Sequence, residues 1–258
     1  MFTLVAYSES QDSASLVNVA ACADPHVRVV GDDIVVPSQV ANLAAVYAIG
    51  ANLTRCQVVS PSIRRRYPLE VLPIDVATEP SDPAKFWGLW SNPIGLDPDE
   101  ALNAQASEDA AGAARSTVLV WLTDGAYTPV TGVEIFTTQA TNTSTLTAFA
   151  WTNGALTFSD TLPAGRYAVV GMRATSAGLI AARLVFPQFA FRPGVIGGDS
   201  VSDWGPSVLR YGTLGVFGEF EHNSPPTVDF LSSSADTSQT VHLDLVLVEG
   251  RLSGPGRT

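Results

Sequence analysis

The chain has 258 residues, of which 46% are apolar and 15% are charged, and its net charge is −11. Soluble proteins usually contain about 25% charged residues, and disordered chains combine low hydrophobicity with high charge, so this composition excludes a disordered protein. The acidic balance and the lack of a basic tail disfavour direct nucleic-acid binding, because contacts to phosphates supply most of that affinity.

The two cysteines and the N-terminal segment disfavour a disulfide-rich, metal-binding or exported protein. Cys22 and Cys56 are too few for a disulfide scaffold and lack the CxxC spacing of a metal or redox site, so we expect buried free thiols. The N-terminal MFTLVAYSESQDSASL has no basic region followed by a continuous apolar stretch, so we expect no signal peptide. No run approaches the roughly 18 apolar residues of a membrane span, and we expect folding in the cytoplasm.

Residues 1–75 predict a mixture of strands and helices. FTLVAYS is a strand candidate, and DSASLVNVAACADP predicts a short helix that ends before Pro25. HVRVVGDDIVVP predicts a hairpin, because two runs rich in β-branched residues surround a Gly-Asp-Asp turn. A longer helix is expected from Ser38 to about Leu53, where apolar residues recur at helical spacing, at Val40, Leu43, Tyr47 and Ala51.

A basic cluster follows, formed by Arg64, Arg65 and Arg66 between the strand candidates CQVVSPSI and LEVLPIDV. Consecutive residues of a strand point to opposite faces, so the cluster does not make a one-sided phosphate site. We interpret it as a rim of salt bridges to acidic neighbours, with contact to packaged nucleic acid as the less favoured alternative.

The proline-rich segment ATEPSDPAKFWGLWSNPIGLDP predicts a loop, because proline is excluded from central strands and helix interiors. Its aromatic part, KFWGLWSNPIGL, allows three explanations: a lid over the protein's own core, a subunit interface, or a ligand platform. The apolar neighbours of the two tryptophans favour a dry contact over a sugar platform. A helix is then expected from Asp97 to about Ala111, with Asp97 as N-cap, Pro98 at the first position and Glu100 completing a capping box.

After residue 115 the pattern is typical of an all-β structure. Short β-rich runs alternate with turn signals, which indicates an antiparallel sandwich or barrel. Two architectures fit: a jelly roll with inserted helices, or a small α+β region followed by a sandwich. We favour one mainly β domain over 1–258, a jelly-roll-like antiparallel sandwich with a few inserted helices and long Pro/Gly loops. In it, 1–114 form a mixed α/β elaboration, 115–250 the sandwich core and 251–258 a flexible tail.

Residues that could carry catalysis do not form a recognisable set. The three histidines, His26, His222 and His242, stand in contexts without ligand or triad spacing. Gly198-Asp199-Ser200 resembles an esterase nucleophile block, but its context favours a structural turn. We therefore expect a protein that is not an enzyme and uses no cofactor or metal.

The chain resembles the single jelly-roll capsid proteins of viruses. The resemblance rests on the strands of residues 115–248, the helix expected at 97–111 and long loops such as FRPGVIGGDSVSDWGP. It implies a structural protein that assembles with copies of itself and with other capsid proteins and resides in the virion. One departure is the acidic, apolar N-terminus, where many coat proteins of RNA viruses carry a basic arm. We expect neither nucleic acid nor a small molecule as ligand.

The alternative is a carbohydrate-binding or adhesin-type sandwich, which would also expose tryptophans but would be monomeric and exported. Under the capsid hypothesis, the aromatic loop and the basic cluster are candidate interface residues: Phe86, Trp87, Trp90, Ile94, Arg64, Arg65 and Arg66.

If the aromatic loop is a subunit contact, Trp87→Ala and Trp90→Ala should weaken self-association more than they lower the melting temperature, because tryptophans dominate many interfaces. Light scattering over a range of protein concentrations and thermal melting measure the two effects. A lower melting temperature with unchanged association would make these rings a lid over the core.

Overall fold

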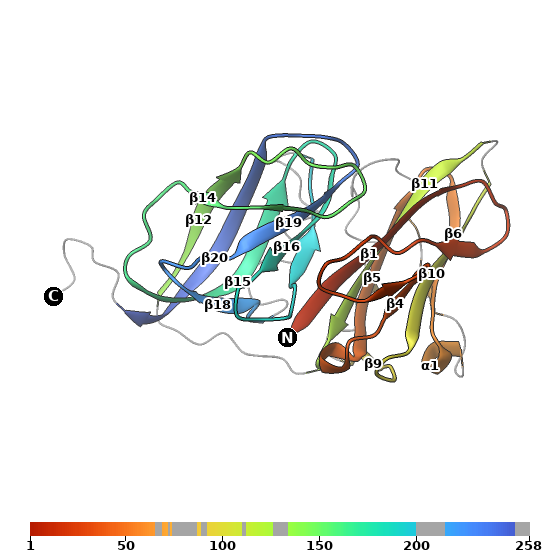
Figure 1. The fold of residues 1–258 in the computed structure, drawn as a ribbon, viewed down its shortest axis with the longest axis horizontal. Coiled ribbons are helices and arrows are strands. Elements are labelled where there is room, and N and C mark those ends of the chain that lie inside the picture. Colours follow the sequence, from red (N-terminus) through yellow and green to blue (C-terminus); the bar gives the residue numbers. More distant parts are fainter. Residues whose placement is uncertain are drawn as a thin grey trace.

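The structure is a computed structural model that describes residues 1–64, 69–71, 73, 87–88, 92–109, 112–125, 134–199 and 215–250. Over these residues the protein is mainly β, with four antiparallel sheets that form two sandwiches lying side by side (Figure 1). The expectation of an antiparallel β-sandwich is confirmed. Among the described residues, no helix is long and apolar enough to cross a membrane.

The first sandwich consists of sheets I and II. Sheet I contains β1 (Phe2–Gln11), β11 (Ala114–Thr123), β5 (Asn42–Gly50), β8 (Trp87–Gly88) and β9 (Ile94–Gly95). Sheet II contains β3 (Val29–Val30), β4 (Asp33–Val35), β2 (Val17–Val19), β10 (Ala101–Glu108), β6 (Leu53–Val59) and β7 (Leu69–Val71). Two short helical turns belong to its connections, η1 (Ser38–Val40) and α1 (Pro61–Arg64).

The second sandwich consists of sheets III and IV. Sheet III contains β14 (Thr157–Phe158), β12 (Glu134–Asn142), β20 (Gln239–Gly250), β15 (Gly165–Thr175) and β18 (Gly218–Glu221). Sheet IV contains β13 (Thr152–Gly154), β19 (Thr227–Ser232), β16 (Leu179–Val185) and β17 (Gly194–Ile196).

Both sandwiches use the same nested pairing of strands. In the first, β1 pairs with β11, β2 and β4 pair with β10, β5 pairs with β8 and β9, and β6 pairs with β7. In the second, β12 pairs with β20, β13 with β19, β15 with β18 and β16 with β17. A long hairpin rolled into two facing sheets has this order, which is that of a jelly roll. The chain thus contains two jelly rolls in tandem.

The boundary between the two groups of strands lies after β11 and not at residue 114, where the sequence analysis placed it. β11 was assigned to the sandwich core of residues 115–250, but it pairs with β1 and β5 in the first sandwich. Whether the two sandwiches fold as a single domain stays a prediction, and the tail 251–258 lies outside the described residues.

The helix predicted from Asp97 to Ala111 is wrong. Residues 101–108 form β10, in which Leu102, Ala104 and Ala106 face the core while the residues between them face outward. The capping signature belongs to a turn: Asp99 has a φ of 63°, and the Glu100 carboxylate accepts hydrogen bonds from the backbone N–H and the hydroxyl of Ser62 instead of capping a helix.

The helices predicted before residue 54 are also wrong. The segment from Ser38 to Leu53 forms η1, then β5, and β6 begins at Leu53. β5 lies in the middle of sheet I and its side chains are buried on both faces, so its sequence is a continuous apolar run that a helical pattern also fits. The segment 12–25 contributes the short strand β2, which pairs with β10.

Other local predictions are confirmed, and one long strand was missed. The hairpin at 26–37 is formed by β3 and β4, with Gly31 at a φ of 62° in the turn. Cys22 and Cys56 are free and buried. β12 was not predicted, because its inward positions include Thr138, Ala140 and Asn142, which do not stand out as an apolar alternation.

Sheet I is covered on both faces. Its inner face, with Val5, Val46 and Val120, packs in the core shared with sheet II. Its outer face, with Leu4, Tyr47 and Trp121, belongs to an apolar cluster that continues through sheets III and IV. The two jelly rolls are therefore joined by apolar packing across sheet I.

Candidate functional site

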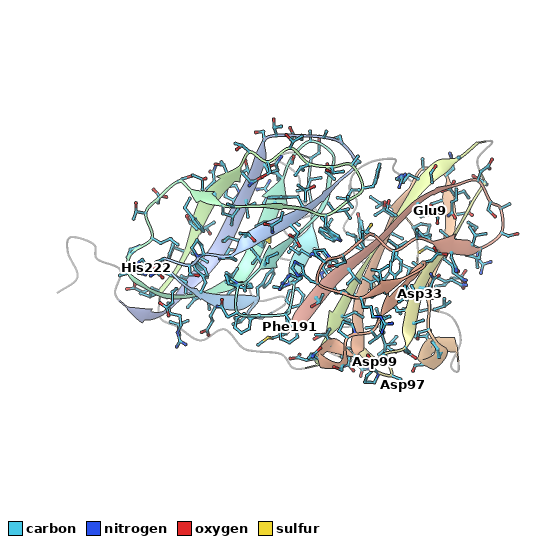
Figure 2. The ribbon with its side chains drawn as sticks, in the orientation of Figure 1. Glu9, Asp33, Asp97, Asp99, Phe191 and His222 are labelled. Atoms are coloured by element: carbon cyan, nitrogen blue, oxygen red, sulfur yellow. The ribbon has the colours of Figure 1, made fainter. Side chains whose placement is uncertain are left out.

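A group of five ionisable side chains in mutual contact lies where the two sandwiches meet. We name this group the ionic junction: Arg183, Asp24, Asp229, His26 and Arg192. The residue before Arg192, Phe191, lies between the two sandwiches in Figure 2 and packs against the core of the first. Asp24 and His26 come from the first sandwich, and the others come from the second.

Arg183 is the centre of the junction. It stands on β16 and is fully buried. Its Nη1 donates to Asp24 Oδ2 at 2.6 Å and to the carbonyl of Leu4 at 3.0 Å, and its Nη2 donates to Asp24 Oδ1 at 3.0 Å. Its Nε donates to Asp229 Oδ2 at 3.1 Å, and Nη2 lies 3.0 Å from the same oxygen. Four of the five N–H donors of the guanidinium thus make hydrogen bonds, and Nη2 also lies within ion-pair distance of Asp229.

Further hydrogen bonds hold both carboxylates in place, from the backbone for Asp24 and from a side chain for Asp229. Asp24 Oδ1 also accepts the backbone N–H groups of His26 and Val27, which fixes the turn after Asp24. Asp229 lies opposite Arg183 in the β16–β19 register and also accepts a hydrogen bond from Asn153. Arg183 therefore meets two preoriented carboxylates, one from each sandwich.

An aromatic ring covers the guanidinium. The Cζ of Arg183 lies 4.1 Å from the ring centroid of Trp151, a geometry for a cation–π contact. The ring also helps to exclude water, and a low local dielectric strengthens the charge–charge attraction within the junction.

His26 is held as a neutral imidazole. Its Nδ1 lies 2.9 Å from Nη2 of Arg192, and a guanidinium can only donate, so Nδ1 accepts and the proton is on Nε2. Nε2 lies 3.9 Å from the Asp229 carboxylate. Burial and then the positive charge of Arg192 lower the pKa of His26.

The backbones of the two sandwiches approach closely beside the junction. Trp121 Nε1 donates to the carbonyl of Gly194 at 2.9 Å, and Leu4 N donates to the carbonyl of Arg192 at 2.9 Å. A Cβ at Gly194 would lie 2.6 Å from the Arg183 Cβ and 2.8 Å from a Leu4 methyl, so only glycine fits there. β1 and β17 are thereby locked to each other.

The arrangement is suited to holding the two jelly rolls together. A buried charge is tolerated when it is paired and hydrogen-bonded, as Arg183 is by Asp24, Asp229 and the Leu4 carbonyl. Arg192 donates to the carbonyls of Phe189 and Phe191, whereas its buried Nε has no hydrogen-bond partner among the described residues. Among the described residues, no group of three or more His, Cys, Asp or Glu side chains could hold a metal ion.

Most interface candidates lie outside the described residues, namely Phe86, Trp90, Arg65 and Arg66. Of Trp87 the backbone is described, and it pairs with Val46 at the edge of sheet I. Ile94 pairs with Leu43 and is partly buried against the first core. Arg64 ends α1. The described candidates therefore lie at two separate places. Trp87 and Ile94 lie on β8 and β9 of sheet I, whereas Arg64 lies on α1, which follows β6 of sheet II.

Asp199 of the esterase-like block and two further acidic side chains, Asp236 and Glu219, have structural partners. Asp199 accepts a hydrogen bond from the Gly178 N–H, and Asp236 accepts from the Ser176 hydroxyl and the Ala177 N–H, so both carboxylates fix the turn between β15 and β16. Ser200 lies outside the described residues. Glu219 pairs with Arg166 at 3.4 Å on the surface of sheet III.

Sequence reasoning missed the ionic junction. The available signal was a charged residue inside an otherwise apolar strand: Arg183 in GLIAARLVF and Asp229 in TVDFL. Such a residue is buried only if a partner compensates it. The partner Asp24, however, is 159 residues away in sequence, and no local pattern identifies it.

A scan against protein-family models and a search of curated proteins find no match. Among solved structures, the chain has a likeness to the major capsid protein P2 from bacteriophage PM2, with 8% sequence identity, complete coverage of both chains and a TM-score of 0.26.

Arg183→Met should lower the free energy of unfolding by about 3–5 kcal/mol, because two buried carboxylates lose their counter-charge. Urea denaturation measures the loss. The matched control is Arg55→Met, which breaks a pair with Glu70 in which both side chains are 55% exposed. That change should cost less than about 1 kcal/mol. Equal, small losses in both variants would contradict the role given to the ionic junction.

The depressed pKa of His26 makes stability depend on pH. Below about pH 6.5 the unfolded chain binds a proton that the folded chain resists. The stabilisation from this site is thus complete above that pH and is lost as the pH falls toward the lower folded pKa. Wild-type melting temperature should fall more steeply between about pH 7.5 and pH 5 than that of His26→Gln. The same replacement at exposed His222 is the control, and identical slopes for wild type and His26→Gln would refute the prediction.

Proposed function

We propose that the protein is a non-enzymatic structural protein that assembles with copies of itself, as a capsid or coat subunit. Its partners are then further copies of the same chain and other capsid proteins, and its place is the virion. Neither a cofactor nor a metal takes part in this function.

The observation that carries the proposal is the joining of the two jelly rolls by the buried Arg183, which makes four hydrogen bonds to groups of both sandwiches. A subunit of a shell must keep its shape under forces from its neighbours. A buried guanidinium that is hydrogen-bonded to both sandwiches resists hinge motion between them. Jelly rolls occur in viral capsid proteins and in lectins, so the fold is compatible with both classes. The charged side chains of the ionic junction bind one another and thereby join the two sandwiches, which favours a structural protein over an enzyme.

The aromatic loop and the basic cluster supply the proposed contacts between copies. β8 places the backbone of Trp87 at an edge of sheet I, and residues on such an edge can reach a neighbouring subunit. Phe86, Trp90, Ile94, Arg64, Arg65 and Arg66 complete the proposed interface. Tryptophan and arginine are enriched at interface hot spots.

Size-exclusion chromatography with light scattering, followed by negative-stain imaging of the peak, tests the proposal. Closed shells, tubes or defined rings are the expected result. A monomer of 27.1 kDa at every protein and salt concentration would reject self-assembly. It would favour the alternative of a carbohydrate-binding module, which is supported by a polar pocket lined by Asn18, Asp33 and Asn103.

A further inference from the structure

A pocket of about 460 Å³ opens on the outer face of sheet II, on the side of the first sandwich that does not face sheet I. This volume is in the range of ordinary small-molecule sites, about 300–1,000 Å³. Asp33, one of its lining residues, lies on the first sandwich in Figure 2. The ionic junction contributes no residue to this lining.

The pocket exists because β10 changes partners along one edge. Ala101 and Leu102 pair with β4, whereas residues 104–106 pair with β2. Asn103 stands between the two partners and points outward, since its neighbours Leu102 and Ala104 are in the core. The gap between β4 and β2 therefore has Asn103 in its wall.

Asn103 contributes a side-chain oxygen that accepts no hydrogen bond from the described residues. Its side chain is 4% exposed, and its Nδ2 donates to the carbonyl of Asp32 at 3.1 Å. Its Oδ1 is buried and has no hydrogen-bond partner among the described residues. Reversing the amide would place its oxygen against the Asp32 carbonyl, so the orientation is fixed. A buried acceptor without a partner is unfavourable, and a ligand hydroxyl that donates to it removes that cost.

Asp33 and Asn18 supply complementary groups. The Asp33 carboxylate is half-buried and has no ion pair or hydrogen bond to the described part of the chain. Asn18 Oδ1 accepts from Gln105 at 2.9 Å, and Gln105 in turn accepts from Gln57 at 2.6 Å. These hydrogen bonds orient the Asn18 side chain through its Oδ1, so its Nδ2 is the group of this lining residue that can donate to a ligand.

The remaining wall contains the apolar residues Val59, Pro61 and Ala101 and the polar Ser60, whose Oγ accepts the Ile63 N–H. An apolar surface next to two acceptors and one donor matches a molecule that carries several hydroxyls on a C–H framework. Hydroxyls can both donate to Asp33 and accept from Asn18, which a simple cation cannot do.

We propose that this pocket binds a sugar residue, with hydroxyls donating to Asp33 and to Asn103 Oδ1 and accepting from Asn18 Nδ2. The inference goes beyond the proposed assembly and does not depend on it, because the pocket belongs to one chain.

Isothermal titration of the full chain with the methyl glycosides of glucose, galactose, mannose and N-acetylglucosamine tests the proposal. At least one glycoside should bind, and Asp33→Ala and Asn18→Ala should each weaken binding roughly tenfold or more, as expected for a lost hydrogen bond to a charged or oriented group. Asn18 is exposed, so its truncation keeps the test valid if Asp33→Ala unfolds. The matched control Glu70→Ala removes a carboxylate from the same face outside the pocket and should leave the affinity unchanged.

Binding of none of the four glycosides would overturn the proposal, as would equal affinity in wild type and both pocket variants. Binding of ethylammonium or calcium in place of the glycosides would show a cation site and would also overturn it. Light scattering on the same samples separates this result from the assembly proposal, because Asp33→Ala leaves the proposed subunit contacts intact.

Discussion

The fold depends on sheet I having both faces buried. Beside its outer face, Arg183 pairs with the buried carboxylate of Asp24. A sheet at the surface needs one apolar face, but sheet I has two, and the second must be covered by another layer. Sheet IV supplies that layer, and its Arg183 extends past its own sandwich to Asp24 and the carbonyl of Leu4. The apolar cluster provides the adhesion, whereas the ionic junction fixes the relative position of the two sandwiches.

This division of roles follows from the physics of the two interactions. Apolar burial is strong but not directional, so it alone would tolerate sliding of one sheet over another. The guanidinium requires in-plane acceptors at fixed positions, which only one arrangement of Asp24 and Asp229 provides. The close approach at Gly194 adds a steric constraint of the same kind. Together they turn two repeated jelly rolls into one defined shape.

Local sequence features predicted the local structure, and they failed where burial is two-sided or where partners are distant. The hairpin of β3 and β4, the β character after residue 115 and the free thiols were accessible from short patterns. β5 was not, because alternation disappears when both faces of a strand are buried. β10 was not, because Asp97-Pro98 imitates a helix start. The ionic junction was beyond reach because it joins residues from both ends of the chain.

The nested pairing also sets an order for folding during synthesis. The first strand of each jelly roll pairs with its last, β1 with β11 and β12 with β20. The edge of β1 that pairs with β11 therefore stays unpaired until residue 123 has left the ribosome. The outer face of β1 stays uncovered for longer, until β16 and β17 have been synthesised. Such long-range closure is slow and leaves apolar strands exposed. A nascent chain of this kind is a natural client for chaperones that bind extended apolar segments.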